Sequence, residues 1–96
     1  MVQQLINDNG NSAANQFVIK TKKATYFQSY DSVVCMLNGK NIILSENWNY
    51  SNTTRKHLYM FLRQNGICNL SSAKDVRNAI KDGLVTLKKV PSLKIV

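Results

Sequence analysis

Short runs of hydrophobic and β-branched residues between positions 16 and 45 have the spacing of β-strands. Residues 17–21 and 24–30 are two such runs, each rich in aromatic or β-branched side chains, and Lys22-Lys23 separates them. Two runs joined by so short a polar segment are typical of a hairpin. The pattern therefore predicts a first hairpin whose tight turn is charged.

A second hairpin is predicted around Asn38-Gly39, a pair suited to the positive φ angles of a type I′ turn. A two-residue loop there pairs Leu37 with Lys40, Cys35 with Ile42 and Val33 with Leu44. In that register one face is almost entirely hydrophobic and needs a cover. This face carries Val33, Cys35, Leu37, Ile42 and Leu44, and the opposite face carries Val34, Met36, Asn41 and Ile43.

Two helices are predicted after this hairpin. The first begins near Ser51 or Asn52, runs to about Asn65 and stops at Gly66, where Ile67 supplies the hydrophobic contact of a Schellman end. Helical spacing places Thr54, Leu58, Phe61, Leu62 and Asn65 on one side, and directs Lys56, Met60 and Arg63 away from it.

The second helix opens with Ser72 and Asp75, close to a capping box, and ends at Gly83. Its inward residues are Val76, Ala79 and Ile80. Residues 84–90 are predicted to form a last strand that Pro91 ends.

This order of elements predicts an α+β fold, with a small antiparallel sheet of three to five strands covered on one face by two helices. Residues 16–96 would form a single domain. Residues 1–15 are predicted to be a flexible N-terminal arm, because 7–12 is a cluster of turn-forming residues with no hydrophobic period. A winged helix–turn–helix, built from the two helices and the final strand, is the competing arrangement.

The net charge of the chain is the most informative feature of its composition. Thirteen Lys and Arg face five Asp and Glu, which gives a formal net charge of +8. A field of this sign favours polyanionic partners and excludes an acidic mimic of nucleic acid. A small protein also needs net charge to remain dispersed, so charge by itself does not decide between DNA or RNA binding and simple solubility.

Few residues suit catalysis or metal binding. The 96-residue chain has one histidine, His57, and two cysteines, Cys35 and Cys68, without metal-ligand spacing. Cys68 with His57 is the one conceivable nucleophilic pair, and no two acids form a local pair for acid–base work. We therefore expect no enzyme activity, no cofactor and no metal. The start lacks the pattern of a signal peptide and no run approaches the roughly 20 hydrophobic residues of a membrane span, so a cytoplasmic protein with reduced thiols is expected.

A basic stripe on the second helix is the leading candidate for a binding site. Lys74, Arg77 and Lys81 recur at helical spacing and can follow phosphates, although a solvated helix face looks the same in sequence. Other basic residues would extend this patch if the fold brings them to one side: Arg55, Lys56, Arg63, Lys22, Lys23, Lys88 and Lys89. Three tyrosines interleaved with these cations are candidates for base stacking: Tyr26, Tyr30 and Tyr59.

Residues 47–56 bring hydroxyl and amide side chains to the start of the first helix and follow them with Arg55 and Lys56. Backbone amides, the helix dipole and these cations together can hold a phosphate. Helix capping alone also explains Ser, Asn and Thr at these positions. Both interpretations stay open, and Trp48 within this segment is assigned to the core or to a lid over the sheet edge.

Two segments carry a resemblance: Phe27-Gln28-Ser29-Tyr30-Asp31-Ser32, and Trp48-Asn49-Tyr50-Ser51-Asn52-Thr53-Thr54 followed by Lys56-His57-Leu58. They resemble segments of short uncharacterised proteins of bacteriophages and mobile elements in low-GC Gram-positive bacteria. The resemblance covers about residues 12 to 64, and relatives tend to have Asp where this chain has Asn49. It implies an accessory protein acting in the cytoplasm of an infected or plasmid-bearing host cell.

Three functions follow as expectations. The first is a non-enzymatic accessory protein that binds nucleic acid or a nucleoprotein complex through its basic helices. The second is a protein-binding inhibitor of a host defence or host enzyme, for example an anti-CRISPR protein, favoured by the hydrophobic tail Leu93-Lys94-Ile95-Val96. The third is a homodimer formed through an edge strand or through residues 92–96. No membrane partner is expected.

Overall fold

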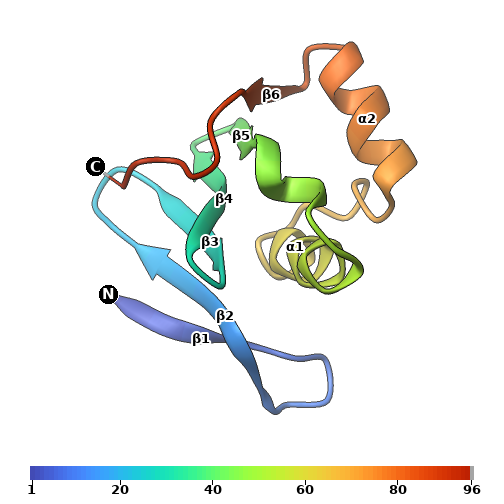
Figure 1. The fold of residues 1–96 in the computed structure, drawn as a ribbon. Helices are drawn as coiled ribbons and strands as arrows, with labels where there is room; N and C mark the ends of the chain where they lie inside the picture. The colour runs from blue at the N-terminus through green and yellow to red at the C-terminus, as the bar shows by residue number, and fades with distance from the viewer. Residues whose placement is uncertain (96) are drawn as a thin grey trace.

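A six-stranded sheet forms the centre of the protein, whose computed structural model describes residues 1–95 (Figure 1). The strands follow one another across the sheet in chain order, and β6 joins β5 in parallel while every other pair is antiparallel. A short 3-10 helix and two α-helices connect β5 to β6 and cover one face. The elements are β1 (Val2–Ile6), β2 (Ser12–Lys20), β3 (Thr25–Ser29), β4 (Ser32–Asn38), β5 (Asn41–Ser45), η1 (Glu46–Asn49), α1 (Asn52–Gln64), α2 (Ala73–Lys81) and β6 (Val85–Lys88).

The predicted α+β class is confirmed, but the sheet is mixed rather than antiparallel and has six strands rather than three to five. The prediction has too few strands because residues 1–15 do not form an arm. They form β1 and the start of β2, paired from Val2↔Ile19 to Ile6↔Ser12. β1 escaped notice because it buries a single side chain, Leu5, and is otherwise exposed, so it shows no hydrophobic alternation. Two helices against six strands also differ from the winged helix–turn–helix considered as the alternative.

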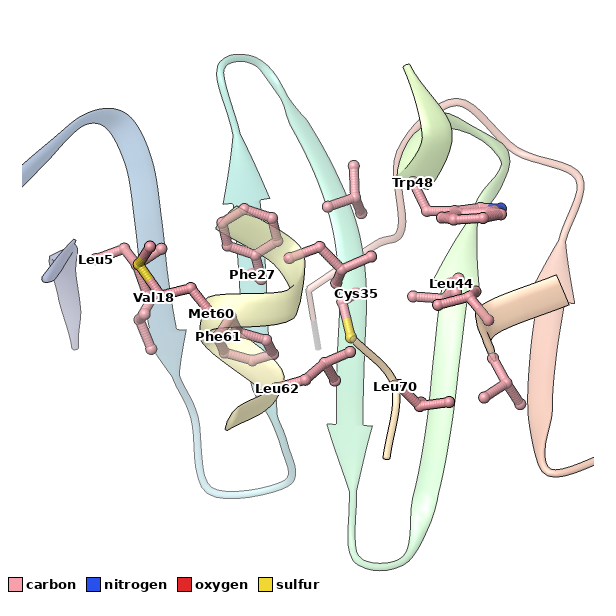
Figure 2. Packing of buried hydrophobic residues seen from close by; sticks show 14 of the residues in the cluster. Leu5, Val18, Phe27, Cys35, Leu44, Trp48, Met60, Phe61, Leu62 and Leu70 are labelled. Atoms are coloured by element: carbon pink, nitrogen blue, oxygen red, sulfur yellow. The ribbon is translucent and has the colours of Figure 1, made fainter. Parts of the chain in front are cut away.

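The N-terminal hairpin also explains why one helix residue was assigned to the wrong side. Met60 was expected to point away from the core, yet it is buried. It belongs to the same cluster as Leu5, Ala13 and Val18, and Figure 2 shows it next to Leu5 and Val18. The hairpin therefore widens the buried side of α1 beyond the stripe that helical spacing predicts.

The turn between β4 and β5 lies at Gly39-Lys40, because Asn38 pairs with Asn41. The predicted loop at Asn38-Gly39 is wrong by one position. Gly39 has a φ of +60° and Lys40 is not in the left-handed region, which is the pattern of a turn that requires glycine at its first central position. Partners consequently shift by two residues, and a shift of two keeps each side chain on its face. Cys35, Leu37, Ile42 and Leu44 all belong to the helix-covered cluster, as predicted.

A β-bulge between β3 and β4 reverses one part of the predicted faces. Phe27 pairs with Cys35, whereas Gln28 pairs with Val33, so Val34 is an extra residue in β4. Val34 consequently joins the cluster under the helices, and Val33 belongs to the cluster on the opposite face. A two-residue period cannot reveal such an insertion, so the sequence placed both valines on the wrong face.

Both helices begin and end where their local signals predict. Ser51 caps α1 by accepting a hydrogen bond from the Thr54 N–H (3.1 Å), and Ser72 caps α2 through Asp75 (3.1 Å). Gly66 and Gly83 follow the two helices with φ of +83° and +80°. Each helix then ends with the six-to-one hydrogen bond of a Schellman motif. The Ile67 N–H donates to the Leu62 carbonyl oxygen in α1, and the Leu84 N–H donates to the Ala79 carbonyl oxygen in α2.

The main core lies between the helices and the sheet. The rings of Phe27 on β3 and Phe61 on α1 stack with centroids 5.5 Å apart, and Leu62 extends this contact toward Cys35 (Figure 2). Val76 and Ala79 of α2 belong to the same cluster, together with Leu44, Trp48, Leu70 and Val85. The assignment of Trp48 to the core is confirmed, since it is almost completely buried.

A smaller cluster covers the opposite face of the sheet and uses the C-terminal segment. Leu93 is buried with Ile19, Ala24, Tyr26 and Val33. The Leu93 N–H donates to the Val33 carbonyl oxygen, and the Val33 N–H donates to Ser92 Oγ, each over 2.9 Å. Figure 1 shows this segment running from β6 back toward the turn between β2 and β3. Leu93 of the predicted hydrophobic tail thus packs on its own sheet, whereas Ile95 is exposed and Val96 lies outside the described residues.

No helix among residues 1–95 is long and hydrophobic enough to cross a membrane.

Leu62→Ala is expected to lower the free energy of unfolding by about 2–5 kcal/mol, since Leu62 is fully buried against the sheet. Leu84→Ala is the matched control, because Leu84 is 67% exposed and its loss should change stability by less than about 0.5 kcal/mol. Urea unfolding followed by tryptophan fluorescence measures both. Equal effects of the two substitutions would contradict the described packing.

The two thiols are expected to react differently. Cys35 is buried, and burial raises the pKa of its thiol, so it is protected as well as protonated. Cys68 is exposed. A thiol reagent should label one cysteine rapidly in the folded protein and the second only after denaturant is added, and Cys68→Ser should remove the rapid phase. Rapid labelling of both thiols would show that the helix-covered core is not formed.

Candidate functional site

A groove on the outer side of α1 gathers cations from the first helix. It has a volume of about 340 Å³, and helical spacing brings Asn52, Arg55, Lys56, Tyr59 and Arg63 to it. Its remaining lining residues come from neighbouring segments and from the same helix: Asp8, Met60 and Ser71. The structure therefore brings together three of the predicted basic residues of α1.

Arg55 is fixed at the start of α1 by two asparagine side chains. Its Nη1 donates to Asn49 Oδ1 over 2.5 Å, and its Nη2 donates to Asn52 Oδ1. A guanidinium has five N–H donors, so these bonds orient the group without using all of its donors. Arg55 is thus held in place, with donors left for a bound anion.

Arg77 of α2 lies near the same place. Its guanidinium carbon is 6.0 Å from the ring centroid of Trp48, the distance of a cation–π contact. Burial raises the pKa of the Tyr59 hydroxyl, and the charges of Arg55 and Arg77 oppose that rise only in part. The phenol therefore stays neutral at physiological pH, and its buried oxygen has no hydrogen-bond partner within residues 1–95.

Few of the cations are neutralised. Arg63 donates to Asp8 over 2.8 Å, and this is the single ion pair in the described part of the chain. Asp75 and Asp82 are each adjacent in sequence to a lysine of the α2 stripe, but neither forms an ion pair within residues 1–95. Asp75 accepts from the backbone N–H of Ser71, which holds the pKa of its carboxyl below the usual value. The positive field of the two helices is accordingly left largely uncompensated.

The other predicted basic residues are exposed but lie on different segments. Lys74 and Lys81 share the exposed side of α2 with Arg77, opposite the buried Val76 and Ala79, as the helical spacing predicts. Lys22-Lys23 lies in the turn between β2 and β3, and Lys88-Lys89 ends β6. Proximity is thus established for the residues of α1 and for Arg77, whereas one lysine pair lies at the turn between two inner strands and the other at the end of the edge strand β6.

The stacking prediction fails for Tyr26. Its side chain is fully buried in the cluster that Leu93 covers, because the C-terminal segment encloses a face that the sequence left open to solvent. Tyr59 is partly buried in the groove. Tyr30 is 47% exposed at the turn between β3 and β4.

A larger cavity, of about 650 Å³, lies where this turn meets the start of α1. Nine of its ten lining residues carry a hydroxyl, amide or carboxylate group, and none carries a positive charge. The lining residues lie in segments 27–32 and 48–54, on which the resemblance stated above is based, and at positions next to them. They are Ser29, Tyr30, Asp31, Ser32, Val34, Asn47, Tyr50, Ser51, Thr53 and Thr54. Both segments were recognised in the sequence, but the cavity between them was not predicted, and Tyr50 was not among the tyrosines proposed for stacking.

Hydrogen bonds at the bottom of this cavity join the sheet to α1. Ser29 Oγ lies 3.1 Å from Thr54 Oγ1, and both residues are buried. Gln16, the register partner of Ser29 on β2, is fully buried, and its side-chain amide has no hydrogen-bond partner among residues 1–95. The cavity therefore adjoins a small polar layer inside the core.

The two interpretations of residues 47–56 can now be compared. Ser51 caps the helix, and Arg55 and Lys56 line the groove rather than this cavity. The geometry supports capping by Ser51, whereas Arg55, which is bonded to Asn49 and Asn52 at the start of α1, lines the groove.

The conceivable nucleophilic pair is not formed by hydrogen bonding in the described chain. His57 Nδ1 is 2.7 Å from the carbonyl oxygen of Thr53, one turn earlier, and Cys68 lies exposed beyond the end of α1. Within residues 1–95 no three His, Cys, Asp or Glu side chains gather in a way that could hold a metal ion.

Ser51→Ala is expected to lower the free energy of unfolding by about 1 kcal/mol, because it removes the cap of α1. Thr53→Ala, two positions further and exposed, is the control and should have a smaller effect. Chemical denaturation measures both, and equal losses would argue against the capping role.

Comparison with known proteins gives one match. The model of a family of unknown function, DUF8033, matches residues 1–79. No curated protein and no solved structure matches the chain. The match spans β1 to most of α2, and so includes both the groove and the larger cavity.

Proposed function

The chain belongs to DUF8033, a family of unknown function, so its function has to be argued from the structure. We propose that it binds nucleic acid through the outer surface of α1 and α2. In this proposal it is a non-enzymatic accessory protein of a phage or mobile element, acting on DNA, RNA or a nucleoprotein complex in the host cytoplasm. The observation that carries the proposal is the group of Arg55, Lys56, Arg63 and Arg77 around Tyr59.

Charge supports this proposal beyond the net value. A total of +8 attracts any polyanion, but a local group of cations is needed to hold phosphates in a fixed register. Arg55 is oriented by Asn49 and Asn52, which reduces the entropy that it would lose on binding. Contacts of this kind position a backbone and carry little sequence information, so we propose binding with weak sequence preference.

The helix surface presents lysines that are available to bind phosphates. Lys56, Lys74 and Lys81 are exposed, and no carboxylate within residues 1–95 forms an ion pair with them. Phosphates that approach these lysines would replace solvent and counterions, whereas at Arg63 a phosphate would compete with Asp8. Release of those counterions is the driving force that we propose for binding.

Inhibition of a host defence or host enzyme, for example as an anti-CRISPR protein, is kept as an alternative proposal. Its support was the resemblance to mobile-element proteins together with the hydrophobic tail, and Leu93 of that tail is buried on the sheet of its own chain. Assembly through the edge strands β1 and β6 is likewise a proposal. Nucleic acid is preferred because the cation group is on the exposed surface and its charge is opposite to that of a phosphate backbone.

Replacement of Lys56, Lys74 and Lys81 by Gln is expected to weaken binding to a 20-nucleotide DNA or RNA at least tenfold in 50 mM salt. The slope of log affinity against log salt should also fall by about two to three, one for each lost phosphate contact. Fluorescence anisotropy over a salt series measures both quantities.

The matched control replaces Lys22, Lys23 and Lys89 by Gln, which removes the same charge from other segments. A smaller loss of affinity is expected for this variant. Equal losses in the two variants would show that only net charge matters and would reject the helix surface, and the absence of binding by the unmodified protein at 50 mM salt would reject the function.

A further inference from the structure

We propose that the 650 Å³ cavity between the β3–β4 turn and the start of α1 receives an unpaired base of a single-stranded nucleic acid. This inference rests on the proposed function and adds to it the form of nucleic acid that is bound. The volume lies within the range of about 300–1,000 Å³ that is usual for small-ligand sites.

Two exposed tyrosines stand at the cavity. Tyr30 is 47% and Tyr50 is 76% exposed, whereas Tyr26, Phe27 and Phe61 are completely buried. Phe17 and Tyr59 are partly buried, so Tyr30 and Tyr50 are the exposed rings among residues 1–95, and both lie beside one concave site. Stacking on tyrosine rings is a common way in which proteins hold unpaired bases.

The lining is suited to a neutral group that donates hydrogen bonds. Asp31 supplies a carboxylate, Asn47 a side-chain amide, and the serines and threonines supply hydroxyl oxygens. With no Lys or Arg in the lining, a phosphate would meet only the negative charge of Asp31. A nucleobase is flat and uncharged and carries amino or imino N–H groups, so it fits both the rim and the lining.

The backbone of Tyr30 is fixed by the turn between β3 and β4. Tyr30 has a φ of +54°, a value that a bulky residue rarely adopts. Its N–H donates to the Asn15 carbonyl oxygen and its carbonyl oxygen accepts from Gln28 Nε2, each over 2.7 Å. Ser29 pairs with Ser32, so this φ is the one that a two-residue hairpin turn requires at its first central position, and the turn holds the backbone of Tyr30 in place at the cavity while its ring is exposed.

The cavity and the basic groove meet at the first turn of α1. Ser51, Thr53 and Thr54 line the cavity, whereas Asn52 and Arg55, which alternate with them in sequence, line the groove. A single strand whose phosphates follow the groove can therefore turn a base into the cavity without leaving the protein surface. A duplex keeps its bases stacked and paired, and so cannot use both places at once.

The test compares three DNA probes of equal length: a single strand, the same sequence as a duplex, and a strand whose nucleotides lack bases. Affinities are measured by anisotropy for the unmodified protein, for Tyr50→Ala, for the Tyr30→Ala/Tyr50→Ala pair and for the Tyr30→Phe/Tyr50→Phe control. We expect the unmodified protein to bind the single strand about tenfold more tightly than the strand without bases.

The alanine pair should lose that preference, and the phenylalanine pair should retain it because the rings remain. Tyr50→Ala alone should lose part of it, and since Tyr50 is the more exposed ring this variant gives a result even if alanine at position 30 disturbs the fold. Binding of the duplex should be unchanged in every variant.

Equal affinity of the unmodified protein for the strands with and without bases would overturn this inference and leave the proposed function intact. Unchanged single-strand preference in Tyr50→Ala and in the alanine pair would also overturn it. Loss of binding to all three probes at 50 mM salt would instead reject the proposed function, and this inference with it.

Discussion

The packing of α1 against the sheet is the interaction on which the rest of the structure depends. Phe61 stacks on Phe27, and Leu58 and Leu62 are completely buried beside it. This contact fixes the axial rotation of α1, so the two sides of the helix that do not face the core are also fixed. One side then forms the basic groove, and the first turn on the other side forms a wall of the larger cavity. Both candidate sites are therefore consequences of one hydrophobic contact.

Burial on both faces of the sheet gives a small chain more core than its length suggests. The helices cover one face, and the segment around Leu93 covers part of the other. That second cover requires no helix or strand, only a few side chains and the hydrogen bonds of Ser92 and Leu93 to Val33. A domain of fewer than about 100 residues buries a limited fraction of its surface, so such a cover contributes substantially to stability.

Features that depend on neighbouring residues could be predicted from sequence, and features that depend on distant pairing could not. Ser51, Gly66 and Gly83 mark the ends of the helices through local backbone chemistry, and the structure confirms each of them. β1 could not be recognised because it buries one side chain, and that burial depends on contacts with β2 and α1, which are distant in sequence. The extra residue Val34 and the covering of Tyr26 also arise from contacts between distant segments.

The same distinction applies to the candidate sites. Helical spacing was enough to group Lys74, Arg77 and Lys81 on one exposed side of α2. The approach of Arg77 to Trp48 and Tyr59 depends on how two helices and η1 pack, and the cavity depends on how a turn and a helix start meet. Their residue types were visible in the sequence, but the distances between them were not.

The parallel pairing of β5 with β6 also has a kinetic consequence. The strands β1 to β5 can form as successive hairpins, each closing a short loop. The Ile42↔Val85 pair instead closes a loop that contains both helices and their connections. The entropy of closing so long a loop makes this pairing the most expensive step to nucleate. We therefore expect β6 and the segment beyond it to join the sheet last, after a helix-covered meander of five strands has already assembled.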